Sequence, residues 1–245
     1  MNENDMNITR RCNSRLLWNF DRRVLLTDED ADARITSGFV IAGFLTFIML
    51  AVVLFTDIPP IGPTEGLLAP NLTGDTHSLG SGGWQSFQLY DELDYDWEAD
   101  SNSSSKWFFI QFMDTDCPYC WDDADMMSQV GNQFADKVTV ISVAVSLDIP
   151  GHSSSTDEII AFQEKTSHSG CKGGGTDCST RPGEAHNWLY LNDLFLSESD
   201  KWEIEGTPFV VIVRPDGIVA WNQGQHPQPA DPGQALADLV LEPEV

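Results

Sequence analysis

The stretch Lys106–Trp121, KWFFIQFMDTDCPYCW, constrains the fold of this chain more than any other. Its first half contains six apolar or aromatic residues, which predict a buried strand, and the polar turn Asp114–Asp116 ends that strand. Apolar residues then recur at mostly helical spacing as far as Phe134, which predicts a helix. Proline directly after Cys117 suits the first helical position, where its missing N–H costs nothing. A Cys-x-x-Cys pair is therefore expected where a buried strand gives way to a helix.

This position favours thiol chemistry. The unpaired N–H groups and the positive dipole end of a helix start both stabilise a thiolate, so we expect the pKa of Cys117 to lie below the ~8.5 of an ordinary thiol. Cys117 is the candidate nucleophile, and Cys120 is the candidate resolving thiol one turn later. One alternative is a structural disulfide, although closing so short a loop would stabilise the fold little. The other alternative is half of a zinc site. We expect no metal and no cofactor beyond a redox-active Cys117–Cys120 disulfide.

The N-terminal part predicts a membrane anchor. Residues 38–55 carry no charge, and 18 helical residues span about 27 Å, close to the roughly 30 Å hydrocarbon core. Six arginines precede this segment, and the next basic residue after it is Lys106. The distribution of Lys and Arg therefore predicts a cytoplasmic segment over residues 1–37, a single transmembrane signal anchor in the cell membrane over residues 38–56 and an extracytoplasmic remainder. The lipid bilayer is thus an expected partner of residues 38–56. A cleaved signal peptide would have a shorter leader and small residues at its end.

The sequence after the anchor is rich in Pro, Gly, Ser and Thr up to residue 83, which predicts a flexible linker over residues 57–83. Asn71 and Asn102 both fit the N-glycosylation pattern. The net charge of −25 argues against nucleic acid as a partner and is typical of a highly solvated surface.

The folded domain is expected to begin near Trp84 and to cover residues 84–245. The pattern predicts strands over 84–90, 138–147, 209–213 and 218–221, and helices over 157–166, 187–196 and 234–241. The turn Arg214–Gly217 joins the last two strands as a hairpin. Strand, helix and strand followed by an antiparallel hairpin and a helix predict an α/β fold with a central mixed sheet flanked by helices.

The motif and the element order together resemble the thioredoxin superfamily, and more narrowly the membrane-anchored TlpA/ResA-like thiol-disulfide oxidoreductases. The stretches FFIQFMDTDCPYC, VTVISVAVSLD and IEGTPFVVIVRPDG carry the resemblance, which covers about residues 84–241. It implies a thioredoxin-like fold and a cis-proline at Thr207-Pro208 packed against the cysteines, where the Thr207 backbone can pair with a substrate chain. Pro118 and Tyr119 are the other expected substrate-binding residues. The chain departs from the family at Asp116, in place of the usual Trp.

The second cysteine pair, Cys171 and Cys178, flanks a Gly-rich loop and favours a structural disulfide outside the cell, with a relay pair that exchanges with the first as the alternative. Gln111 stands where thioredoxins often have a buried acid, and Asp116 adds a negative charge that should oppose a thiolate at Cys117. The remaining titratable candidates are loop histidines without an expected catalytic role: His77, His152, His168, His186 and His226.

These features together predict a membrane-tethered enzyme with an extracytoplasmic domain that exchanges disulfides with exported proteins, in either direction, and that has a membrane or extracytoplasmic redox partner. A peroxiredoxin-like peroxidase is one alternative, although the Thr and Cys spacing at Thr115–Cys117 differs from that of peroxiredoxins. A metal-delivering or protein-binding module on the same fold is the non-enzymatic alternative.

Overall fold

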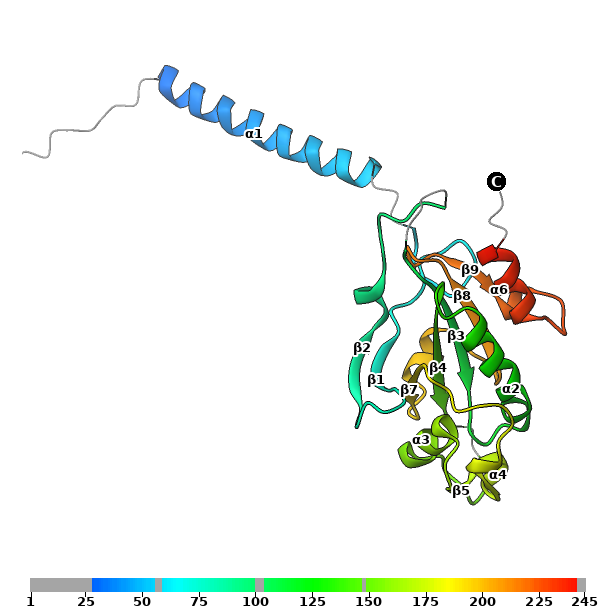
Figure 1. Cartoon of the computed structure of the whole chain (residues 1–245). Helices are drawn as coiled ribbons and strands as arrows, with labels where there is room; N and C mark the ends of the chain where they lie inside the picture. The colour runs from blue at the N-terminus through cyan, green and yellow to red at the C-terminus, as the bar shows by residue number, and fades with distance from the viewer. Residues whose placement is uncertain (1–27, 56–58, 100–103, 147–148, 242–245) are drawn as a thin grey trace, which may run out of the picture. The chain divides into compact units, whose positions relative to one another are not determined.

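A computed structural model describes residues 28–55, 59–99, 104–146 and 149–241 (Figure 1). The chain divides into two compact units, Met1–Ile58 and Pro59–Val245. The first contains helix α1 (Asp28–Phe55), whose side chains are described from residue 37 to residue 51. Within the residues described in this way, no helix is long and apolar enough to cross a membrane. The anchor over residues 38–56 stays a prediction, and residues 1–27 of the expected cytoplasmic segment lie outside the described residues.

The second unit is built on a seven-stranded mixed sheet with the order β2-β1-β7-β4-β3-β8-β9. The three central strands β7, β4 and β3 are parallel, and β8, β9, β1 and β2 extend the sheet by antiparallel pairing at its two sides. The strands are β1 (Thr73–His77), β2 (Gln85–Gln88), β3 (Trp107–Met113), β4 (Val138–Val145), β7 (Leu189–Asp193), β8 (Phe209–Val213) and β9 (Val219–Asn222). A separate two-stranded sheet pairs β5 (Ser169–Gly170) with β6 (Thr176–Asp177).

Strand β3 divides the core because its side chains alternate between the two faces of the sheet. Phe109 and Met113 belong to one hydrophobic cluster, and Phe108, Ile110 and Phe112 belong to the other. All five are at most 3% exposed, as expected for a central strand covered on both faces. The buried strand predicted from the sequence is therefore confirmed.

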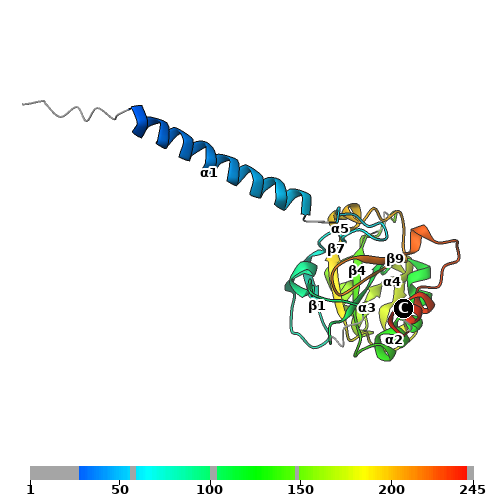
Figure 2. The ribbon, with the colours of Figure 1, turned by 90° about the horizontal axis from the view of Figure 1, so that it is seen from above.

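Helices cover the first face. The cluster on this face includes residues of α2 (Pro118–Gln133), α3 (Thr156–Glu164) and α6 (Pro232–Leu241), and Figures 1 and 2 show α2 and α6 on the same side of the sheet. The remaining short helical elements are α4 (Cys171–Gly174), α5 (Ser197–Lys201), η1 (Leu89–Glu92), η2 (Cys178–Thr180) and η3 (Gln223–Gln225). This arrangement of a mixed sheet and flanking helices is the predicted thioredoxin-like α/β fold.

The second face is covered by a segment predicted as a flexible linker, and that prediction is wrong for residues 59–83. Ala69 and Leu72 are fully buried in the second cluster, and β1 pairs with both β2 and β7. The Ala69 N–H donates to the Gly217 carbonyl at 2.8 Å, which ties the segment to the β8–β9 hairpin. A composition typical of loops thus forms part of the sheet, because long-range pairing and burial outweigh local propensity.

Two further elements differ from the prediction, one in its type and one in its length. The helix predicted over residues 187–196 is wrong: residues 189–193 form β7, which runs parallel to β4, and α5 follows from residue 197. A short apolar run does not distinguish a strand from a helix, and the free edge of β4 decides the outcome here. The strand predicted over residues 84–90 is shorter, because residues 89–92 form a 3₁₀ turn. Asn102, one of the two predicted glycosylation sites, lies outside the described residues.

Candidate active site

The turn between β3 and α2 places Cys117 at the helix start. The Asp114 carbonyl accepts a hydrogen bond from the Cys117 N–H at 3.1 Å, and the Asp114 carboxylate accepts one from the Asp116 N–H at 2.7 Å. An aspartate that bonds to the backbone two residues later stabilises a tight turn. Cys117 is the N-cap of α2, and Pro118 occupies the first helical position, as the sequence predicts.

Both cysteines of the pair are free thiols and both are covered. Cys117 is 3% exposed and Cys120 is 2% exposed, whereas Tyr119 is 71% exposed and Pro118 is also exposed. The dipeptide between the cysteines is therefore the exposed part of the motif. The sulfur atoms lie at the edge of the core, within the hydrophobic cluster beneath α2.

The segment before β8 completes the site. The Thr207–Pro208 peptide is cis, and the Cys117 thiol donates a hydrogen bond to the Thr207 carbonyl at 3.3 Å. The structure thus brings Thr207 against Cys117 across 90 residues of sequence, the arrangement that the resemblance implies. The Thr207 hydroxyl is buried, and within the described part of the chain it has no partner of ordinary hydrogen-bond geometry.

The two thiols differ in acidity. A hydrogen bond from the Cys120 thiol is the largest of the effects that lower the pKa of Cys117 to about 6, against the opposing effect of burial. The Thr207 hydroxyl and the N–H groups of Tyr119 and Cys120 add to the lowering, as expected at a helix start. Burial and the hydrogen bond to Cys117 raise the pKa of Cys120 well above its ordinary value. The direction predicted for Cys117 is confirmed.

The second cysteine pair forms a disulfide, and its loop packs on the active-site turn. The Lys172 N–H donates to the Thr115 carbonyl at 2.9 Å. The Lys172 ammonium lies 3.4 Å from the Asp122 carboxylate and 5.6 Å from the Trp121 ring centre. The sequence predicts this disulfide but not its contact with the turn, because no local pattern links the two segments.

Asp116 does not direct its charge at the cysteines in the way that the sequence suggests. Its carboxylate accepts hydrogen bonds from the N–H groups of Gly173 and Gly174 at 3.0 and 2.9 Å and lies 3.2 Å from His152. The main contributions to the Cys117 pKa come instead from its hydrogen-bond partners and from burial. The carboxylate is therefore engaged by the disulfide loop and by His152.

Sequence reasoning missed a group of side chains beside this turn. His152 and Glu158 join Asp116, and their ligand atoms lie close enough together to hold a metal ion. His152 reads as an ordinary loop histidine, and Glu158 reads as a first-turn acid of a helix. The only sequence signal is the unusual aspartate before the first cysteine.

A pocket of about 480 Å³ lies beside the site. Gln111, which replaces the buried acid of thioredoxins, lines it together with Asp123, Met126 and Pro208. Burial raises the pKa of Asp123, and the neighbouring Asp122 adds to the shift. The pocket thus runs from the cis-proline along the side of α2.

No protein-family model and no curated protein matches the chain. Among solved structures, it is similar to a thiol:disulfide interchange protein from Bacteroides sp. at 17% identity, with 74% of this chain and 93% of that chain covered and a TM-score of 0.48. It is also similar to a putative thiol:disulfide interchange protein DsbE from Chlorobium tepidum, at 18% identity, 73% and 96% coverage and a TM-score of 0.46.

A further similar structure is the reduced 2-Cys peroxiredoxin of Plasmodium vivax, at 13% identity, with 72% of this chain and 79% of that chain covered and a TM-score of 0.47. The fold assignment follows from the topology itself. A Cys-x-x-Cys helix after the central strand β3, a parallel β4 and an antiparallel β8–β9 hairpin that begins at a cis-proline form one unit. The second unit of this chain has a thioredoxin-like fold.

Proposed function

We propose that this chain is a membrane-tethered extracytoplasmic thiol-disulfide oxidoreductase that exchanges disulfides with exported proteins through Cys117 and Cys120. The observation that carries the proposal is the pairing of an acidic thiol at a helix start with a second thiol one turn later, both beside Thr207-Pro208. A thiolate that forms near neutral pH is the nucleophile that disulfide exchange requires.

The proposed exchange has two steps. The Cys117 thiolate attacks one sulfur of a substrate disulfide, which forms a mixed disulfide and releases the other substrate sulfur as a thiolate that takes up a proton. Cys120 then loses its proton and attacks the Cys117 sulfur, which releases the second substrate thiol. The substrate disulfide is reduced by two electrons, and the two thiols of the chain are oxidised to a disulfide. The reverse sequence oxidises a substrate dithiol.

The surroundings of Cys117 support binding of an extended substrate segment. The Thr207 carbonyl accepts from the Cys117 thiol in the reduced protein, so it becomes available to a substrate N–H once that proton is lost. Main-chain pairing of this kind gives affinity without sequence preference. The exposed Pro118 and Tyr119 and the pocket beside Pro208 offer apolar surface on either side.

The membrane tether rests on the uncharged segment of residues 38–55. The large apolar side chains described on α1 are exposed, among them Phe39 and Met49 at 74% each, and a lipid surrounding would bury them. The arginines before this segment support a cytoplasmic N-terminus. Resistance of the full-length protein to alkaline extraction from membranes tests the tether, and protease access to the domain in spheroplasts tests the side.

Reduction of insulin disulfides by the full-length chain in detergent tests the activity. We expect Cys117→Ser to abolish it and Cys120→Ser to accumulate a mixed disulfide. Undiminished exchange by Cys117→Ser would overturn the proposal, and so would consumption of peroxide in place of insulin reduction, which would favour a peroxidase. Redox titration of the Cys117–Cys120 pair with alkylation then gives the direction, since about 30 mV changes the balance by about 1.4 kcal/mol.

A further inference from the structure

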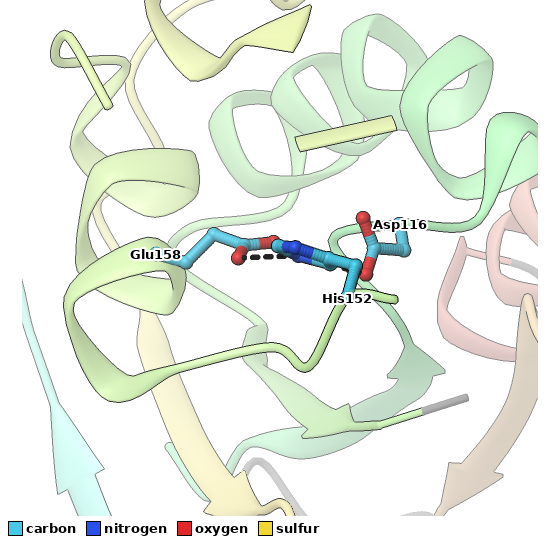
Figure 3. A group of neighbouring side chains, drawn as sticks. All are labelled: Asp116, His152 and Glu158. Atoms are coloured by element: carbon cyan, nitrogen blue, oxygen red, sulfur yellow. Dashed lines mark hydrogen bonds and ion pairs between the residues drawn. The ribbon is translucent and has the colours of Figure 1, made fainter. Parts of the chain in front are cut away.

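Three ligand-type side chains from separate parts of the chain meet beside the active-site turn. Asp116 comes from the turn itself, His152 from the loop after β4, and Glu158 from the first turn of α3. His152 Nε2 lies 3.2 Å from Asp116 Oδ2 and 3.1 Å from Glu158 Oε2, and the ligand atoms of all three residues lie within 4.8 Å of one another. Figure 3 shows the imidazole between the two carboxylates.

The contacts around the three residues orient them toward one point. Asp116 Oδ1 is held by the N–H groups of Gly173 and Gly174, and Glu158 Oε1 is held by the hydroxyl of Thr115. The second oxygen of each carboxylate thereby faces His152 Nε2. Among the residues that the structure describes, the Ser154 hydroxyl, at 3.3 Å from Asp116 Oδ2, is the one further donor to these oxygens. Outer contacts of this kind orient metal ligands in proteins.

The two carboxylates of the group are buried beside a single imidazole. Side chains of Asp116 and Glu158 are each 1% exposed, and in the described part of the chain neither pairs with a Lys or Arg. Buried carboxylates need a cation or several hydrogen bonds as partners, because removing a charge from water is costly. A divalent cation held between the imidazole nitrogen and one oxygen of each carboxylate would supply such a partner to both.

We propose that Asp116, His152 and Glu158 form a binding site for a divalent first-row transition-metal ion. One imidazole nitrogen and two carboxylate oxygens suit Mn²⁺, Fe²⁺, Co²⁺ and Zn²⁺ and do not suit soft Cu(I). The side chain of His152 is 22% exposed, which gives the ion a path of entry. Three protein ligands leave coordination positions for water.

The disulfide loop is shaped to this group. A Cβ added at Gly170 would lie 2.9 Å from Glu158 Oε2, and a Cβ added at Gly174 would lie 2.9 Å from His152 Cγ, so neither position has room for a side chain. Both glycines have positive φ angles, which also disfavour other residues. The Cys171–Cys178 disulfide holds this glycine-rich loop against the ligands.

Titration with Mn²⁺ tests the proposal. The full-length chain in detergent is stripped of metal and used with Cys117 and Cys120 oxidised, so that no free thiol of the pair competes, in about 1 M KCl to screen binding to the acidic surface. Electron paramagnetic resonance of free Mn²⁺ measures the bound fraction. We expect one Mn²⁺ per chain, displaced by Zn²⁺, which ranks above Mn²⁺ for such ligands, and not by Ca²⁺.

Matched variants distinguish Mn²⁺ binding at this site from Mn²⁺ binding to the acidic surface. His152→Ala and Glu158→Gln should each weaken Mn²⁺ binding at least about tenfold, since even outer-shell changes cost that much. His168→Ala and Asp157→Asn change another loop histidine and the neighbouring exposed acid, and both should leave binding unchanged. In the wild-type chain, spin-echo modulation from one imidazole nitrogen should appear and should vanish in His152→Ala.

Other results would overturn the site. If the wild-type chain binds no more Mn²⁺ than the His152→Ala variant, the metal site is refuted, and the three side chains are a hydrogen-bonded group instead. The site is also refuted if Ca²⁺ displaces Mn²⁺ as well as Zn²⁺ does, or if Asp157→Asn weakens Mn²⁺ binding as much as Glu158→Gln does. Either result would mean that Mn²⁺ binds to the acidic surface in general. Near-ultraviolet circular dichroism checks that each variant keeps its fold, and Glu158→Gln keeps the shape of the side chain. None of these measurements depends on disulfide exchange, so the site and the proposed activity fail separately.

Discussion

Cys117 and Cys120 stand one helical turn apart, yet their thiols have opposite acidity. A hydrogen bond from the Cys120 thiol contributes most to lowering the pKa of Cys117 to about 6. For Cys120 burial comes first, and the same hydrogen bond to Cys117 also raises its pKa. One contact therefore helps to make the first cysteine a nucleophile and to keep the second protonated until the mixed disulfide has formed.

The acidity of Cys117 predicts how alkylation depends on pH. In the reduced protein, iodoacetamide should modify Cys117 before Cys120, and the rate should rise through a midpoint near pH 6 because only the thiolate reacts. Peptide mass spectrometry separates Cys117 from Cys12. Cys120→Ala should raise the midpoint, and Cys120→Ser, which keeps a hydroxyl donor, should raise it less. An unchanged midpoint in Cys120→Ala would show that the hydrogen bond is not the cause.

The same shift links the stability of the reduced protein to pH. The pKa of Cys117 is about 6 in the folded state and ~8.5 in an unfolded chain, so it is lowered by folding. Its stabilising contribution is then fully present above about pH 8.5 and is lost as the pH falls through about 6. Urea unfolding should show the reduced wild-type chain gaining stability over reduced Cys117→Ser between these values. A pH-independent difference would contradict the lowered pKa.

At the scale of elements, α2 closely approaches the residue that directly precedes β7, and the contact is at one glycine. A Cβ on Gly131 would lie 2.6 Å from Trp188 Cζ3, and Trp188 is fixed by stacking on His186 and by a hydrogen bond to Ser142. Gly131→Ala should therefore lower the free energy of unfolding by about 1–3 kcal/mol through overpacking, offset in part by up to about 1 kcal/mol of helix propensity.

Thermal or urea unfolding measures the effect of Gly131→Ala. Gly233→Ala is the matched control, because its Cβ would meet only the Asp231 carboxylate, at an ordinary 3.4 Å. That change should be neutral or mildly stabilising, since alanine favours a helix. Equal effects of the two substitutions would contradict a steric role of Trp188.

The disulfide loop is an element held by a covalent bond. Cys171 and Cys178 are fully buried and seven residues apart in sequence, so the bond is shielded from thiol exchange and closes a short loop. Changing both to Ala should lower the free energy of unfolding by about 2.5 kcal/mol by loop entropy and should leave insulin reduction by Cys117 intact. Loss of exchange in a folded variant would instead make the two cysteines a relay pair.

The elements that sequence could predict are those specified locally. The strand, turn and helix of Lys106–Trp121 follow from apolar period and turn chemistry, and the β8–β9 hairpin follows from Arg214–Gly217. Strands β1 and β7 were missed because their pairing partners, not their own residues, make them strands.

The residues of the candidate site also differ in whether a local sequence pattern predicts them. The two cysteines follow from the local motif, and the contact between Cys117 and Thr207 follows only from resemblance to a family. The group of Asp116, His152 and Glu158 is created by tertiary packing of loops, for which the sequence holds no periodic signal.

At the scale of the whole molecule, the most prominent feature is the excess of acidic residues. The net charge is −25, with 38 acidic residues against 13 basic ones. Within the described residues, Lys and Arg form three ion pairs, at Asp122, Glu198 and Asp216. All three basic side chains are more than a third exposed, and in the Lys172–Asp122 pair both partners are. Exposed pairs contribute little to stability, so repulsion among unpaired acids outweighs them.

Salt should therefore stabilise this protein. Raising KCl from about 0.1 M to about 1 M shortens the screening length from about 10 Å to about 3 Å, which weakens repulsion among surface carboxylates. The unfolding temperature of the full-length chain in detergent should rise steadily over this range. Sucrose at matched osmolality, which screens no charge, is the control and should reproduce only a small part of the rise. An unfolding temperature that falls with KCl would mean that attractive ion pairs, not repulsion among acids, set the electrostatic stability of the fold.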